Sequence, residues 1–197
     1  MKIANVLIIL LLTFASYGQR GALKKFMKLV DQAGMVFTMP EGFKVVDIKE
    51  NRDLSYHFAI MNEEETTEVR YTIWPLDDFL KEYEESLKDT NRMMLEPNRL
   101  YKSMIMANAM NMTNGQLPEI ESFPPSAVKK EFNADDGGTC VFEFDCQFGE
   151  GYKIGQFIYL HKDDVTDAIV TYMSNDINVH LKEMQKAFHS LKFKKVN

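Results

Sequence analysis

The sequence has few of the features that support redox, nucleic-acid or membrane-spanning roles. Only two of its 197 residues are cysteine, and 29 acidic residues outnumber 23 lysines and arginines, which gives a formal net charge of −6 at pH 7. A nucleic-acid partner requires a basic surface, so this charge argues against one. The apolar run at residues 6–12 is shorter than the roughly 20 residues that cross a bilayer.

Catalytic motifs are also missing. The chain contains no Gly-x-Ser-x-Gly, no His-Glu-x-x-His and no phosphate-binding glycine loop. Nucleophilic catalysis brings together a nucleophile, a base and an orienting group. The four histidines stand in no such motif: His57, His161, His180 and His189. We therefore predict no enzyme, no catalytic residue and no cofactor, and an enzyme of unrecognised type ranks third among our hypotheses.

One segment has the beginning of a calcium loop. Residues 133–138 read Asn-Ala-Asp-Asp-Gly-Gly, with oxygen ligands close together and glycine at the sixth position. The twelfth position is Phe144, where a calcium loop requires a bidentate glutamate. We predict a hairpin turn at residues 135–138 instead, because Asp and Gly accept positive φ angles.

The cysteines are predicted to be unbonded. Alternating residues from Cys140 to Phe148 suggest one strand over residues 139–148, with both Cys140 and Cys146 on its buried face. Six residues of strand span roughly 20 Å, whereas a disulfide needs Cα atoms about 4.4–6.8 Å apart. We expect two buried, inert thiols.

Residues 1–18 have the layout of a secretory signal peptide. Lys2 precedes the apolar run, and Ser16 and Gly18 occupy positions −3 and −1 relative to a cut before Gln19. No cysteine lies near this cut to carry a lipid anchor. We expect a secreted or periplasmic protein, residues 19–197, that forms a single α+β domain without a membrane anchor.

Periodicity in the remaining chain predicts two blocks of strands, each followed by helix. An amphipathic helix ending at Gly34 comes first, and helices are predicted from residue 76, over residues 97–112 and from Asp176. Strands are predicted at 35–39, 43–48, 56–61, 68–74, 127–133, 139–148, 152–161 and 165–173. This order predicts a layered α/β/α sandwich, with helices flanking a central antiparallel sheet.

Two of these elements carry specific burial predictions. In the fourth strand, alternation places Val69, Tyr71 and Ile73 inward and the residues between them, Glu68, Arg70 and Thr72, outward. The last helix is predicted to bury a stripe of apolar residues: Ile177, Leu181, Met184, Phe188 and Leu191.

Methionine is the one compositional excess, with thirteen residues. Four of them form a Met-x-Met-x₃-Met-x-Met array at Met104, Met106, Met110 and Met112. Thioether clusters can bind Cu(I), and flexible methionines can also fill a core or form a partner surface. On a helix only Met106 and Met110 are neighbours, so this spacing favours packing over a four-methionine copper site.

Short segments resemble a known family. Residues 37–43, Phe-Thr-Met-Pro-Glu-Gly-Phe, are similar to its Phe-x-x-Pro-x-Gly-aromatic opening, and residues 188–193, Phe-His-Ser-Leu-Lys-Phe, are similar to its close. Residues 132–135, 151–153 and 161–162 resemble uncharacterised secreted bacterial proteins of this type. With the order of elements, these resemble the PsbP-like fold, named for an extrinsic subunit of photosystem II. The resemblance implies a sheet between helix layers and a role in docking onto partners.

These observations predict a non-enzymatic binding or assembly module of the bacterial cell envelope or exterior. Its partner would be another envelope or extracellular protein. The alternative is a carrier of a small ligand or of a soft metal such as Cu(I).

Overall fold

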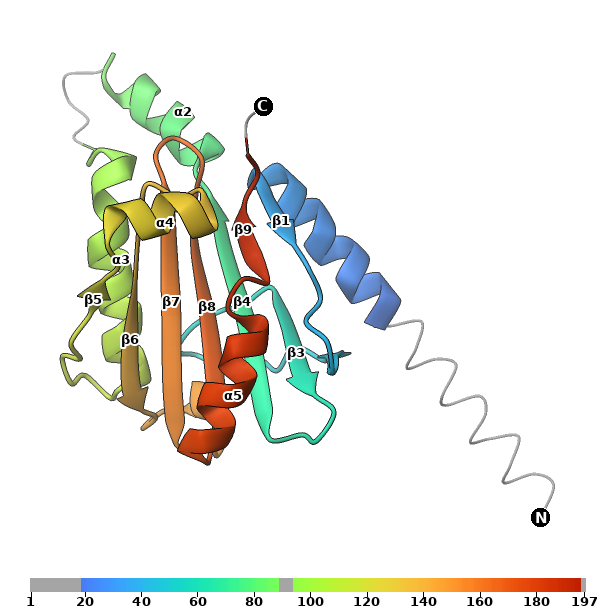
Figure 1. The fold of residues 1–197 in the computed structure, drawn as a ribbon. Helices are drawn as coiled ribbons and strands as arrows, with labels where there is room; N and C mark the ends of the chain where they lie inside the picture. The colour runs from blue at the N-terminus through green and yellow to red at the C-terminus, as the bar shows by residue number, and fades with distance from the viewer. Residues whose placement is uncertain (1–18, 89–93, 196–197) are drawn as a thin grey trace.

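The computed structural model describes residues 19–88 and 94–195, so the predicted signal peptide at residues 1–18 lies outside the described residues. A seven-stranded antiparallel sheet forms the centre, with strand order β2-β3-β4-β8-β7-β6-β5. Helices lie on both of its faces: α4 and α5 cross in front of it and α3 lies behind it in Figure 1. This arrangement confirms the predicted α+β sandwich with a central antiparallel sheet.

Six of the seven strands of this sheet overlap predicted strands, and β5 lies in a segment for which no strand was predicted. The seven strands are β2 (Phe43–Val46), β3 (Phe58–Asn62), β4 (Thr67–Pro75), β5 (Glu121–Ser122), β6 (Asp136–Glu143), β7 (Ile154–Lys162) and β8 (Thr166–Ser174). A separate two-stranded antiparallel sheet joins β1 (Met35–Phe37) to β9 (Leu191–Phe193), so it connects the two ends of the described chain.

The first face of the sheet is covered by the helix over residues 19–32, by β1 and β9, and by α4 (Pro125–Phe132) and α5 (Ile177–Ala187). Phe26 and Val30, four residues apart on the first helix, are each 1% exposed. The ring of Phe26 stacks on that of Phe58 in β3, with ring centroids 4.3 Å apart. The predicted apolar stripe of this helix is therefore correct at Phe26 and Val30, whereas Met27, which the same pattern included, is 40% exposed.

The second face is covered by α3 (Pro97–Met112). Proline at the first helical position is compatible with a helix start, and Asn114 and Gly115 take positive φ angles where the chain turns away. The buried residues of α3 recur every three or four positions, so one side of the helix packs on the sheet: Tyr101, Ile105, Ala109 and Met112. By contrast, α2 (Asp77–Ser86) buries only Ser86.

The predicted strand at residues 127–133 is wrong, because this segment forms α4. Pro125 occupies the first helical turn, and Asn133 ends the helix in the left-handed conformation with φ of 53°. Val128 and Phe132, four residues apart, provide its buried side. A spacing of four residues fits both one turn of a helix and the alternation of a strand, so a segment this short does not distinguish the two.

The predicted turn at residues 135–138 is also wrong, because Asp136, Gly137 and Gly138 begin β6. A Cβ atom at Gly138 would lie 2.3 Å from the carbonyl oxygen of Glu121, so glycine permits the close approach of β5. The strand ends at Glu143, and a 3-10 turn (Gln147–Gly149) follows. Both cysteines are unbonded as predicted, although Cys146 lies beyond the strand and is only partly buried.

The predicted outward face of β4 is buried. Arg70 is 0% exposed, and its guanidinium lies between the rings of Tyr56 and Phe148, 4.5 and 4.6 Å from their centroids. It donates to Glu68 at 2.6 Å and to the carbonyl oxygen of Phe148 at 2.6 Å. The segment around Phe148 therefore covers a face that alternation alone assigned to solvent.

The apolar stripe predicted for α5 is only partly correct. Ile177 and Leu181 are 49% and 52% exposed, whereas His180 and Glu183 are buried. The helix begins where predicted, because the Asp176 carboxylate accepts hydrogen bonds from the amides of Asn178 and Val179. Polar partners on the sheet hold His180 inward, which rotates the two apolar side chains toward solvent.

Candidate functional site

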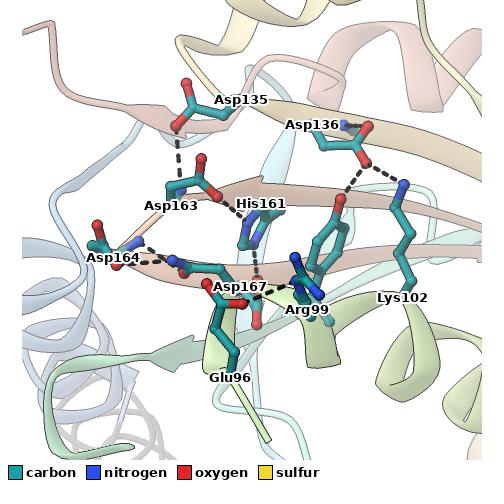
Figure 2. Close-up of polar contacts among 12 residues, drawn as sticks. Glu96, Arg99, Lys102, Asp135, Asp136, His161, Asp163, Asp164 and Asp167 are labelled. Carbon is teal, nitrogen blue, oxygen red and sulfur yellow. Dashed lines mark hydrogen bonds and ion pairs between the residues drawn. The ribbon is translucent and has the colours of Figure 1, made fainter. Parts of the chain in front are cut away.

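A polar network lies where the β7–β8 hairpin meets the start of β6 and the start of α3 (Figure 2). His161 in β7 lies opposite Asp167 in β8. Its Nδ1 atom is 2.6 Å from Asp167 Oδ1, and its Nε2 atom is 2.9 Å from Asp163 Oδ1 in the hairpin turn. Each ring nitrogen of this buried imidazole therefore faces a carboxylate.

This arrangement favours the charged form of His161. Burial acts to lower the pKa of His161, but the hydrogen bonds and charges of Asp167 and Asp163 outweigh burial and raise that pKa above its usual value. An imidazolium donates through both nitrogens, which matches the two acceptors. The two carboxylates therefore stabilise the protonated form of this buried ring.

Tyr101 connects the network to α3. Its ring stacks on the His161 ring with centroids 3.8 Å apart and planes 5° apart. Its hydroxyl donates to Asp136 Oδ2 at 2.5 Å, and Lys102 lies 3.4 Å from the same oxygen. One helix is thus fixed both to β6 and to the β7–β8 hairpin.

The remaining acidic groups of the network also have partners. Lys129 of α4 lies 2.9 Å from Asp135, which accepts a second hydrogen bond from the amide of Asp163 at 3.2 Å. The side chain of Asn98 exchanges two hydrogen bonds with Asp164. Within residues 19–88 and 94–195, no group of three His, Cys, Asp or Glu side chains could hold a metal. We interpret this network as a structural clamp.

The other histidines make separate contacts. His57 Nδ1 accepts from the amide of Ile73 at 3.1 Å, and His189 pairs with Glu131 on the surface. His180 contacts Ser174 and Gln156. None of these arrangements combines an exposed nucleophile with a base.

The methionine array lies on α3 as predicted. Met112 is 0% exposed and belongs to the core of the second face, while Met104, Met106 and Met110 are partly buried. Met112 is therefore a packing residue. Copper binding at the array stays the alternative hypothesis.

Beyond the end of the short strand β5, β6 lies at the edge of the sheet. Strand β5 is two residues long and pairs only with Gly138 and Thr139. The amide of Phe123 donates to the carbonyl oxygen of Gly137, and just past the strand the amide of Asp145 donates to the carbonyl oxygen of Met112. Odd-numbered residues along β6 therefore direct their backbone groups away from β7. Val141 and Glu143 continue this outward series beyond the end of β5, and Val141 is 58% exposed.

A hollow of about 530 Å³ adjoins this open edge. It lies between residues 141–145 and the segment that follows α3, and its lining includes Thr113, Leu117 and Pro118. The Thr113 hydroxyl donates to the carbonyl of Gln116 at 2.6 Å, which holds this segment in a fixed turn. Leu117 is 70% exposed beside the hollow. An extended chain could occupy this space and pair with β6.

The sequence reasoning missed both the clamp and the open edge. The signal for the clamp was misplaced by one residue, since the predicted turn at residues 162–164 pairs His161 with Val165, whereas the structure pairs Lys162 with Thr166 and His161 with Asp167. The open edge had none, because it depends on the shortness of β5.

No protein-family model matches this chain, and a search of curated proteins finds no significant match. Among residues 19–88 and 94–195, no helix combines the length and apolar character needed to cross a membrane.

Proposed function

We propose that this protein is a non-enzymatic binding module of the bacterial cell envelope or exterior. In this proposal it binds an extended segment of another envelope or extracellular protein along β6. The observation that carries the proposal is the open edge at Val141 and Glu143, next to a hollow of about 530 Å³. The resemblance to the PsbP-like fold also supports a docking role.

Strand addition suits this edge for a physical reason. Unpaired backbone groups at a sheet edge are a template for another strand, and the main-chain hydrogen bonds supply affinity. A segment entering from the end of β5 would continue the pairing that β5 begins at Thr139. Val141 and Leu117 would contact its apolar side chains.

Charge favours a basic partner. Glu143 and Asp145 line the hollow, and no lysine or arginine does so. Glu121 in β5 adds a further exposed acid beside it. A second copy of the chain paired along the same edge would bring these acidic groups together, so like-charge repulsion disfavours it. The partner segment is therefore expected to carry lysine or arginine beside β-branched residues.

A synthetic strand peptide tests the proposal. We suggest adding a nine-residue peptide of alternating lysine and valine to residues 19–197, with a glutamate-for-lysine peptide as the charge control. Amide hydrogen exchange measured by NMR should show new protection at Val141 and Glu143 with the basic peptide only. Absence of protection there with the basic peptide would contradict the proposal.

A proline variant provides the matched control. The amide of Val141 points away from β7, so Val141→Pro removes an outward donor without removing a hydrogen bond of the β6–β7 ladder. We expect Val141→Pro to abolish peptide protection and Val141→Thr to retain it. Sedimentation at increasing concentration checks for pairing of two copies, and a dimer lost in Val141→Pro would instead assign the edge to self-association.

A further inference from the structure

A second hollow, of about 430 Å³, lies on the other side of the molecule from β6. One side of the helix over residues 19–32 forms one wall, and residues around the start of β3 form the other. Its lining consists of Ala22, Lys25, Phe26, Lys28, Leu29, Gln32, Ile48, Tyr56 and His57. This volume lies in the usual range for small-molecule sites.

The apolar floor of this hollow is rigidly held. Phe26 is 1% exposed and stacks on Phe58. Tyr56 is 5% exposed, its hydroxyl accepts from the amide of Lys49 at 2.7 Å, and its ring lies against the Arg70 guanidinium. Near the opening, Ile48 leaves 48% of its surface exposed. An apolar chain entering here would cover the surface of Ile48 that is now in contact with water.

The rim of the hollow is basic. Lys25 and Lys28 project from the helix, and no carboxylate in the described parts of the chain is within ion-pair distance of either. Burial and the charge of Lys25 lower the pKa of His57. Because His57 Nδ1 accepts from the amide of Ile73, the neutral ring carries its proton on Nε2. Lys25, Lys28 and His57 therefore line one hollow in an acidic protein.

We propose that this hollow binds a single-chain anionic amphiphile, a carboxylate with an unbranched alkyl tail. Lys25, Lys28 and His57 receive the carboxylate, and the tail lies over Leu29 and Ile48. An inorganic anion would leave the exposed surface of Ile48 uncovered, and a neutral alcohol would leave the ammonium groups unpaired. This site goes beyond the proposed protein-binding edge and shares no residue with it.

Calorimetric titration with dodecanoate, below its micelle concentration, tests this site on residues 19–197. We expect saturable binding of one dodecanoate per chain, with dodecanol and dodecyltrimethylammonium binding at least about tenfold more weakly. Equal binding of dodecanol would overturn the carboxylate assignment, and absence of saturable dodecanoate binding would overturn the site.

Variants locate the two parts of the ligand. The double variant Lys25→Gln, Lys28→Gln should weaken dodecanoate binding about tenfold, because it removes both ammonium groups that pair with the carboxylate. Lys24→Gln is the matched control, because Lys24 is exposed on the same helix but outside the hollow. Ile48→Asp should weaken dodecanoate binding while leaving the melting temperature unchanged. An equal loss in Lys24→Gln would overturn the proposal.

A vesicle experiment separates a bound amphiphile from attraction to a lipid surface. Sedimentation with phosphatidylglycerol vesicles should show no binding that survives 0.15 M salt, since surface charge is screened at that ionic strength. Vesicle binding in the absence of monomeric dodecanoate binding would overturn the proposal in favour of a membrane surface. Val141→Pro should leave dodecanoate affinity unchanged, so failure of this site is distinguishable from failure of the β6 edge.

Discussion

Two buried histidines on opposite faces of the sheet have opposite charge preferences. His161 and His180 are 2% and 1% exposed. His161 faces the carboxylates of Asp167 and Asp163, and its pKa is raised. His180 faces the Ser174 hydroxyl and the Gln156 amide oxygen, each at 3.1 Å, and burial lowers its pKa. Similar burial therefore accompanies opposite pKa shifts, because the partners supply charge in one case and only dipoles in the other.

The two histidines also hold different helices. His161 stacks against Tyr101 and so fixes α3 to the end of the β7–β8 hairpin. His180 is itself part of α5 and fixes that helix to β7 through Gln156. The amide nitrogen of Gln156 in turn donates to the Thr139 hydroxyl at 3.0 Å. The structure therefore attaches one helix by an ionic clamp and another by a chain of neutral hydrogen bonds.

The largest expected effect comes from breaking the ionic clamp. Asp167→Asn removes the buried carboxylate and leaves the His161 imidazolium with only the partly solvated Asp163, whose side chain is 62% exposed. Breaking a buried ion pair by removing one partner costs about 3 kcal/mol or more. Urea denaturation should show this loss. Asp163→Asn is the control, for which we expect under about 1 kcal/mol.

A smaller loss is expected on the neutral side. Gln156→Leu removes the acceptor for His180 Nε2 and leaves that buried donor unpaired, which costs about 1–3 kcal/mol. The same urea measurement should place this variant above Asp167→Asn in stability. Equal losses in the two variants would show that the difference in charge between the clusters has no energetic consequence.

The pH dependence separates the two histidines by sign. For His161 the folded pKa is raised, so its contribution to stability is complete below the unfolded pKa of about 6.5 and is lost as pH rises through the folded pKa. For His180 the folded pKa is lowered, so its contribution is complete above about 6.5 and is lost as pH falls through the folded pKa.

NMR titration of the ring protons measures both values directly. His161 should titrate above the unfolded value and His180 below it. His161→Gln should flatten the alkaline side of the stability curve, and His180→Gln the acidic side. A His161 ring that is already neutral at pH 6 would contradict the clamp.

Much of this fold was predictable from local pattern, whereas the sites were not. The positions of α3, β7 and β8 follow from periodicity, from the helix start at Pro97 and from the turn predicted at residues 162–164. Alternation failed at Arg70, because a segment 78 residues away covers it. It failed again at residues 127–133, where apolar residues one helical turn apart also fit the alternation of a strand. Burial that depends on distant segments carries no local signal, and so neither hollow was predicted.

The smallest expected effect tests why the pattern of α5 was misleading. Ile177 and Leu181 continue an apolar series along the helix, yet both are about half exposed, and His180 lies inward between them. If the neutral network sets this rotation, Ile177→Asp should change the unfolding free energy by less than about 0.5 kcal/mol. Its position at the helix N-terminus even favours an acid, by about 0.3–1 kcal/mol at most. Thermal and urea denaturation provide the measurement, with Ala187→Asp as the matched control, because Ala187 is 0% exposed and a buried unpaired charge should be severely destabilising. A large loss in Ile177→Asp would mean that the apolar stripe packs inward after all, and that His180 does not determine which side of α5 meets the sheet.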